Sequence, residues 1–454
     1  RRSARHERRL APRAALAGRG DPRMKIDELY RSRLTTAEEA VKHIQSNSRL
    51  YLGGGAGTPQ ALVRAMVARA AELHNIEVVS VLTFAGADYL APEYSGSFRH
   101  RALFIGSNAR EAVNSGRADF NPIFLSEIPR LFRDGTLPVD IALIQVSRPD
   151  EHGFCSFGIE VGVTKPAAQA AKMVIAEVNA KMPRVLGDSF IHISKLDHIV
   201  ETDYLLPEAV QGGFSETHNQ IGARVAELIP DGATLQLGIG SIPDAVLFHL
   251  TERRDLGIHS ELFSDGVIDL VDRGVITNEK KTLHPGKIVA GFLFGSQALY
   301  EFVNDNGLIE MHPTDYVNDP FIIAQNDNMI AINSAIEVDL TGQVSADSIG
   351  PRFYSGVGGQ VDFVRGAARS RGGKPIIALP ATARDGKESR IVAQLKPGAG
   401  VTTSRNDVHY VVTEYGVAQL HGMSIRDRAC ELIKIAAPQF REDLERYARA
   451  QKWI

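Results

Sequence analysis

A single carboxylate, Glu261, interrupts an otherwise apolar run in the segment GIHSELFSDG (residues 257–266). The flanking Leu262 and Phe263 mark the run as a buried strand. Burial disfavours the ionised form of a carboxyl group and raises its pKa, and a like charge on Asp265 would add to this effect if the two approach. A desolvated carboxylate can act as a nucleophile that forms covalent intermediates. Glu261 is therefore a candidate nucleophile, although a glutamate exposed at a strand edge is the alternative for this residue taken alone.

A glycine turn precedes that strand, in the segment LGIGSIPDAV (residues 237–246). Such a turn joins a strand to a helix, and the free N–H groups at the start of a helix bind anions such as phosphate. Pro243 stands where the dinucleotide fingerprint has its third glycine, which disfavours a Rossmann dehydrogenase. A purely structural turn is the alternative for this motif by itself. The candidate binding residues are Gly238, Ile239, Gly240, Ser241 and Ile242.

A second glycine cluster lies in YSGVGGQVDFVRGA (residues 354–367), at Gly356, Gly358 and Gly359. Closely spaced glycines create a nest of backbone N–H groups that holds an anion or a developing oxyanion. A flexible hairpin would explain the glycines but not the polar residue Gln360 that follows at once. This cluster therefore favours a binding role.

Other common chemistries have no support in the sequence. No serine carries a glycine two residues before and two after it, which excludes the hydrolase elbow, and no P-loop motif is present. None of the fourteen histidines pairs at metal-ligand spacing with a second histidine, a cysteine or a carboxylate cluster. The sequence therefore predicts no bound metal.

Strand-like and helix-like segments alternate along most of the chain. A helical pattern at residues 59–73 follows the first strand, and one or two helices are expected after residue 423, with Pro438 starting or interrupting the second. This alternation predicts βαβ units, with helices on the faces of a parallel or mixed sheet. Short β-branched runs bounded by Gly, Pro or Asp lie at residues 49–55, 76–84, 139–147, 171–178, 233–240 and 374–380.

Two pairs of similar segments indicate an internal duplication. YLGGGAGTPQALVRAM (residues 51–66) is related to the turn at residues 237–246, and residues 141–158 resemble residues 331–350. The two pairs are separated by similar distances, which favours duplication over coincidence. The fold class is therefore α/β, with two similar open α/β domains. We expect residues 24–210 and 211–454 to form them, because residues 204–220 are polar and contain glycine.

Composition restricts the partners. The chain has 454 residues and a formal net charge of −3, which predicts no binding to nucleic acid. Its longest apolar runs are too short for a membrane span. Residues 1–23 hold eight Arg against Glu7 and Asp21, which predicts a disordered leader or upstream extension, with a transit peptide as the alternative. With only Cys155 and Cys430, no disulfide framework exists, so we expect a cytoplasmic or matrix-like compartment.

Several motifs together resemble the family I CoA-transferases, in the acetyl-CoA hydrolase/transferase branch that includes 4-hydroxybutyrate and butyrate:acetate CoA-transferases. The resemblance covers the chain from about Met24 onward and follows the family's order and spacing. It implies a CoA-transferase (NagB-like) fold, coenzyme A as a substrate and a homodimer. The motifs are GIGSIPDAV, GIHSELFSDG, EVDLTGQVSAD, SGVGGQVDF and VTEYGVAQLHG.

The resemblance also implies roles for particular residues. Glu261 matches the nucleophile that attacks an acyl-CoA and passes through an anhydride to a glutamyl-CoA thioester. Gly358 and Gly359 match candidate oxyanion donors, and the N-terminal half matches the domain that accommodates the carboxylate. The positions matching CoA contacts are the turn residues 238–242, Ser355, Gly356, Gly359, Gln360 and Arg384. An acyl-CoA hydrolase and a non-catalytic CoA-binding protein remain the alternatives to transfer between short-chain carboxylates.

Overall fold

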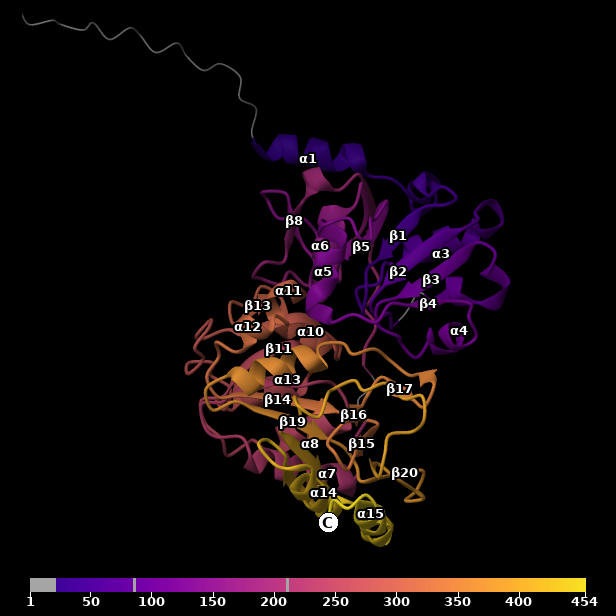
Figure 1. Ribbon diagram of the computed structural model, residues 1–454. Coiled ribbons are helices and arrows are strands. Elements are labelled where there is room, and N and C mark those ends of the chain that lie inside the picture. Colours follow the sequence, from indigo (N-terminus) through magenta and orange to yellow (C-terminus); the bar gives the residue numbers. More distant parts are fainter. Residues whose placement is uncertain (1–21, 85–86, 210–211) are drawn as a thin grey trace, which may run out of the picture.

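The computed structural model describes residues 22–84, 87–209 and 212–454. Almost all of the predicted leader, and the predicted domain boundary between residues 210 and 211, lie outside these ranges. Figure 1 shows the first half of the chain, in indigo to magenta, above the second half, in orange to yellow. Among the described residues, no helix is both long and apolar enough to cross a membrane.

The first half is built on a seven-stranded parallel sheet in the order β4-β3-β2-β1-β5-β7-β9. The predicted runs at residues 49–55, 76–84, 139–147 and 171–178 form β1, β2, β5 and β7. The strands are β1 (Arg49–Leu52), β2 (Ile76–Ser80), β3 (Phe98–Ala102), β4 (Asp119–Phe120), β5 (Ile141–Val146), β7 (Met173–Asn179) and β9 (His198–Thr202), with β6 (Phe154–Ser156) and β8 (Phe190–His192) as a separate pair.

The second half is built on an eight-stranded sheet in the order β13-β12-β11-β10-β14-β19-β23-β24. Only the last strand runs antiparallel to its neighbour. The strands are β10 (Thr234–Gln236), β11 (Gly257–Phe263), β12 (Ile288–Leu293), β13 (Ile309–Met311), β14 (Met329–Ser334), β19 (Lys374–Ala378), β23 (Tyr410–Thr413) and β24 (Gly416–Gln419). Short strands outside this sheet are β15 (Glu337–Asp339), β16 (Val344–Ser345), β17 (Ser348–Ile349), β18 (Arg352–Phe353), β20 (Thr382–Ala383), β21 (Glu388–Ser389) and β22 (Ile391–Val392).

The two sheets share one connectivity. In each half the first strand is central, the next three follow outward on one side, and the remaining parallel strands lie on the other side. The turn GGGAGTP follows β1 and the turn GIGSIP follows β10, so the related sequences occupy the same place in the two sheets. The predicted α/β class and the duplication of the fold are thus confirmed.

Helices cover both faces of each sheet. In the first half they are α1 (Pro22–Arg33), α2 (Ala37–Ala40), α3 (Gln60–Ala68), α4 (Arg110–Asn114), α5 (Ile128–Arg133) and α6 (Thr164–Ala170). In the second they are α7 (Glu216–Glu227), α8 (Ser241–Phe248), α9 (Gly266–Asp272), α10 (Gln297–Val303), α11 (Thr314–Val317), α12 (Pro320–Ile323), α13 (Gln360–Arg369), α14 (Ile425–Ile435) and α15 (Pro438–Ala450). Pro438 begins α15, where its missing N–H needs no partner.

One hydrophobic cluster runs through both halves, from Tyr51 in β1 to Val412 in β23. The backbones of the halves also bond directly. The N–H groups of Val161 and Gly162 donate to Gly291 O, and the N–H of Leu293 donates to Ile159 O. A segment of the first half therefore lies against β12, the neighbour of the strand that carries Glu261.

Candidate active site

Glu261 lies near the carboxyl end of β11, as the sequence predicts. The strand pairs in parallel with β12 through Ser260↔Ala290 and Leu262↔Phe292. The sheet therefore fixes the residues directly before and directly after Glu261. The chain leaves the sheet at once and begins α9 at Gly266. Ligands of open α/β folds bind outside the carboxyl ends of the strands, and Glu261 occupies that place.

Two donors hold the carboxylate of Glu261. The side-chain N–H of Asn318, just after α11, donates to Oε2 over 3.1 Å. The backbone N–H of Gly359, at the start of α13, is the second donor. A Cβ at residue 359 would overlap both Glu261 Oε2 and Asn318 Nδ2, so only glycine allows this approach. The second glycine cluster therefore lies directly against the candidate nucleophile.

The pKa of Glu261 is raised to about 7. Burial is the main cause, and the hydrogen bonds from Asn318 and Gly359 oppose it. A carboxylate in this setting is ionised near neutral pH but poorly solvated, which leaves its oxygen available for attack on an electrophile.

Two further carboxyl groups come close to Glu261. The first is Glu160, which sequence reasoning did not find. Burial raises the pKa of Glu160 to about 8, with the Thr164 and Val163 hydrogen bonds opposing and the charge of Glu261 adding to the rise. Glu160 is a lone charged residue in the apolar segment FGIEVGV, the same signal that singled out Glu261.

The other carboxyl group is Asp362, on α13. Burial raises its pKa to about 7 against its hydrogen bonds with Ser126, and the charge of Glu261 contributes to the rise. Ser126 donates to it through both its backbone N–H (3.1 Å) and its hydroxyl (2.9 Å). Asp362 thus joins the second half to the first beside the site. Asp265, the expected neighbour of Glu261, instead accepts hydrogen bonds from Ser296.

Glu261 lines two adjoining cavities. One has a volume of about 220 Å³ and is also lined by Gly238, Gly358 and Gly359. The other has about 50 Å³ and lies between the halves, lined among others by Glu160, Phe104 and Leu125 of the first half and by Thr314 of the second. Glu261 therefore lies between a glycine-lined space of mixed polarity and a small, mostly apolar pocket.

The structure brings most of the predicted binding residues together. Ile239, Gly240 and Ser241 line a wide cleft of about 940 Å³. Gly240 has φ 112°, which only glycine adopts without strain, and it begins α8. The residues that share the 220 Å³ cavity with Glu261 are Gly238, Ser355, Gly356, Gly358, Gly359 and Gln360.

Three predicted residues differ from the rest: Ile242 and Arg384 line none of the cavities, and Gln360 lines one but has its side chain engaged by the protein. Ile242 lies in α8 and is buried, with 7% of its surface exposed. Both ends of the Gln360 amide already have protein partners, Ser334 O at 2.7 Å and the Thr403 hydroxyl at 3.0 Å. Arg384 lies on the β20–β21 hairpin, pairs with Glu388 over 2.8 Å, and lines none of the cavities described above. Its contact with CoA stays a prediction.

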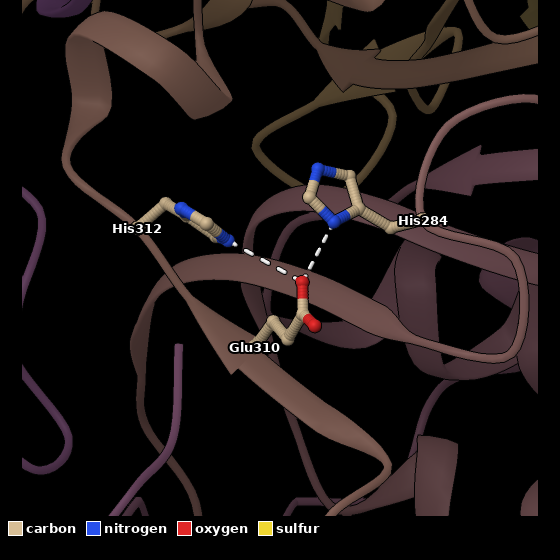
Figure 2. A group of neighbouring side chains, drawn as sticks. All are labelled: His284, Glu310 and His312. Atoms are coloured by element: carbon tan, nitrogen blue, oxygen red, sulfur yellow. Dashed lines mark ion pairs between the residues drawn. The ribbon is translucent and has the colours of Figure 1, made fainter. Parts of the chain in front are cut away.

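Sequence spacing also missed a group of metal-ligating side chains. Glu310 in β13 and His312 directly after it meet His284, which comes from the loop before β12 (Figure 2). The pairing of β12 with β13 brings that loop to Glu310, so spacing within one segment could reveal only Glu310 and His312. These three side chains could hold a metal ion, whereas the sequence predicts no bound metal.

Comparisons with known proteins agree with the fold. Residues 20–209 match the acetyl-CoA hydrolase/transferase N-terminal domain, and residues 295–448 match the C-terminal domain. A 4-hydroxybutyrate coenzyme A transferase of Clostridium kluyveri is 55% identical over 421 residues, which cover 93% of this chain and 98% of that protein.

Solved structures give the same answer. The structure of 4-hydroxybutyrate CoA-transferase from Porphyromonas gingivalis is 45% identical, with a TM-score of 0.82 over 94% of this chain and 99% of that one. RipA from Yersinia pestis is 39% identical, with a TM-score of 0.90 over 94% of this chain and 100% of that one. Fold, site and relatives define an enzyme of the CoA-transferase class.

Within that class, the chain belongs to the acetyl-CoA hydrolase/transferase family. Glu261 lies between the two matched domains, in residues that neither match includes. The geometry of Glu261 and the motif around it therefore support its role.

Proposed function

We propose that this enzyme moves CoA between short-chain carboxylic acids, of the 4-hydroxybutyrate, butyrate and acetate type, through a covalent intermediate on Glu261. The observation that carries the proposal is the position of Glu261, a desolvated carboxylate with pKa about 7 where a glycine-lined cavity meets a small closed pocket. The relatives named for 4-hydroxybutyrate support this choice of acids.

Each step exchanges one activated acyl group for another. A Glu261 oxygen attacks the thioester carbonyl carbon, the C–S bond breaks, and CoA leaves as a thiolate from an acyl–glutamyl anhydride. The thiolate then attacks the Glu261 carbonyl, and the acyl carboxylate departs to leave a glutamyl-CoA thioester. A second carboxylate attacks that thioester, and the same steps in reverse give the new acyl-CoA. Because thioester energy is conserved, the site must exclude water from the intermediates.

The described residues suit these steps. The N–H of Gly359 and the amide of Asn318, which hold the Glu261 carboxylate, would also stabilise an oxyanion formed at its carbonyl carbon. The wide cleft beside α8, lined by Ile239, Gly240 and Ser241, would take CoA, and Gly238 would contact it from the adjoining cavity. Arg384 would meet the CoA phosphates. The small pocket of about 50 Å³ would take the acyl group, because its size admits only a short chain.

We also propose the division of labour between halves that the resemblance implies. Residues 24–210 would accommodate the carboxylate, and residues 211–454 would supply the nucleophile and bind CoA. A homodimer in the cytoplasm is the proposed working form. The large apolar side chain of Phe321, on α12 and 79% exposed, supports a contact between copies, which light scattering on the purified protein tests.

The decisive experiment is the intact mass of the protein after mixing with butyryl-CoA, followed by borohydride reduction and peptide mapping. A mass increase of CoA less one water, with reduction at residue 261, supports the proposal. Glu261→Gln should show neither, whereas Glu252→Gln, at an exposed glutamate of the same half, should behave as wild type.

Added acetate separates transfer from hydrolysis. A transferase converts acetate to acetyl-CoA while butyrate appears, whereas a hydrolase releases free CoA at a rate that acetate does not change. A non-catalytic CoA-binding protein would show tight CoA binding with no adduct and no turnover, and Glu261→Gln would then change nothing.

A further inference from the structure

His284 and the neighbouring residues Glu310 and His312 come together outside the two cavities that Glu261 lines (Figure 2). Glu310 Oε2 lies 2.6 Å from His284 Nδ1 and 3.5 Å from His312 Nε2. The three ligand atoms all lie within 4.8 Å of one another. Imidazole nitrogen and carboxylate oxygen are the donors that divalent transition metals such as Zn²⁺ use in proteins.

The backbone fixes where each donor points. Glu310 lies in β13 between the fully buried Ile309 and Met311, so strand alternation turns its side chain to the opposite face. His312 follows directly, and its N–H donates to Ala290 O over 2.9 Å. His284 has φ 50°, a strained conformation for a residue with a Cβ, in a turn that faces β13.

The nitrogen of His312 that faces Glu310 lacks a hydrogen bond. Nε2 is buried and has no hydrogen-bond partner among the described residues, and its distance of 3.5 Å from Glu310 Oε2 is that of a loose ion pair. Buried polar atoms normally have a hydrogen-bond partner, so a buried ring nitrogen without one is available to coordinate a metal ion.

A second contact orients the other histidine. The hydroxyl of Tyr316, on α11, lies 2.6 Å from His284 Nε2. With Nε2 bonded to the tyrosine, Nδ1 is the atom left for a metal, and such outer contacts fix the tautomer of metal-binding histidines.

We propose that His284 Nδ1, Glu310 Oε2 and His312 Nε2 form a binding site for one divalent transition-metal ion, with Zn²⁺ as the ion that fits it best. Donors around a tetrahedral Zn²⁺ lie roughly 3.3–3.5 Å apart, because Zn–N and Zn–O bonds are about 2.0–2.2 Å long. The contact between His312 and Glu310 already has that spacing. The contact between His284 and Glu310 would lengthen by less than about 1 Å as the ion replaces it.

The neighbouring charges are compatible with a cation. Lys281 is the cationic side chain that faces Glu310, but its Nζ donates to the carbonyls of Ile258 (2.8 Å) and Lys287 (2.6 Å). Asp188 of the first half adds negative charge on the side of His312.

A metal here would act on structure and not on the chemistry. It would tie the loop of His284 and the edge strand β13 to the start of α11, through His312 and Pro313. Asn318, which holds Glu261, follows α11 directly. The ion would therefore steady one of the two donors to the nucleophile from outside the substrate cavities.

The test uses the untagged full-length chain, stripped with a chelator and titrated with ZnCl₂ at pH 7.5 by calorimetry, with CoCl₂ in parallel. We expect one equivalent of Zn²⁺ to bind, a visible absorption band typical of tetrahedral Co²⁺, and a rise in Tm on adding Zn²⁺. Glu310→Gln and His312→Gln should each weaken binding at least tenfold, and Tyr316→Phe, which keeps all three donors, should weaken it about 10–100-fold.

His43→Gln is the matched control, because His43 stacks on His198 at 4.1 Å in the first half, far from these donors. It should bind Zn²⁺ as wild type does. Circular dichroism establishes that each variant is folded before titration. Binding of equal strength in wild type and in folded His312→Gln and Glu310→Gln would overturn the proposal, as would the absence of any stoichiometric binding by wild type. Neither outcome would affect the proposed chemistry at Glu261.

Discussion

Glu261, Glu160 and Asp362 reach one site from three distant segments, and their protons are coupled. The pKa of Glu261 is raised to about 7 and that of Glu160 to about 8, and the charge of Glu261 contributes to the rise at Glu160. When Glu261 carries its charge, like-charge repulsion favours the protonated form of Glu160. The pair therefore favours one carboxylate, on the proposed nucleophile, and one neutral carboxyl group that can donate a hydrogen bond across the small pocket.

This coupling predicts the pH dependence of the first half-reaction. Because the raised pKa keeps Glu261 protonated in acid, kcat/KM for an acyl-CoA should rise with pH through an apparent pKa of about 7 and fall about tenfold per unit below pH 6. Initial rates with butyryl-CoA between pH 5 and 9 measure it. A profile that is flat down to pH 5 would contradict the assignment, and the exposed Glu252→Gln variant should keep the wild-type limb.

Glu160 predicts a cost in stability. Its folded pKa of about 8 lies above the ordinary value of 4.5, so the folded protein keeps a proton that the unfolded chain releases. The stability contributed by protonated Glu160 is complete below pH 4.5 and is lost as pH rises through 8. Glu160→Gln, which mimics the protonated form, should raise the free energy of unfolding by about 2–4 kcal/mol at pH 8.5 and by little at pH 5.

Urea unfolding of both proteins at the two pH values measures this difference. An equal effect of the substitution at pH 5 and pH 8.5 would show that Glu160 is not protonated in the folded protein. Activity should be largely retained in the same variant, because the glutamine amide is neutral and can donate the same hydrogen bond across the pocket.

At the scale of elements, the start of α13 places the backbone of Gly359 against Glu261, the proposed nucleophile. Gly359→Ala would place a methyl group against Glu261 Oε2 and Asn318 Nδ2, so these side chains must shift out of their present contact. We expect kcat to fall at least 100-fold, because both donors to the carboxylate are displaced, while circular dichroism stays unchanged. Gly307→Ala, at a glycine with open space around its Cα, should keep full activity.

The elements themselves follow from the sequence more readily than the site does. Apolar runs such as residues 171–178 become strands because they are buried on both faces of a parallel sheet, and the repeated glycine turns reveal the duplication. Asn318 could not be found in this way. It contacts Glu261 only because β11 and α11 pack together, and an asparagine after a short helix has no distinctive local pattern.

At the scale of the whole molecule, the two halves are one folding unit. A single apolar cluster extends from the first sheet to the second, and Ser126 and Asp362 bond across the join. We expect one cooperative thermal transition, with calorimetric and van't Hoff enthalpies in agreement. Two resolved transitions would show that the halves unfold separately. Asp362→Asn tests the join and should lower Tm without splitting the transition.

The shared strand order has a consequence for how such an enzyme can change over time. The pair Leu50↔Val78 in the first sheet is equivalent to the pair Leu235↔Ile258 in the second. Val81 lies three residues after Val78, as Glu261 lies three residues after Ile258, so Val81 takes the place of Glu261 in the first half. Val81 lines the same small pocket from the opposite side. The second half therefore carries the reactive carboxylate where the first half has an apolar side chain on the wall of the pocket. Substitutions in that wall are expected to alter the accepted acid while leaving the strand of the proposed nucleophile unchanged.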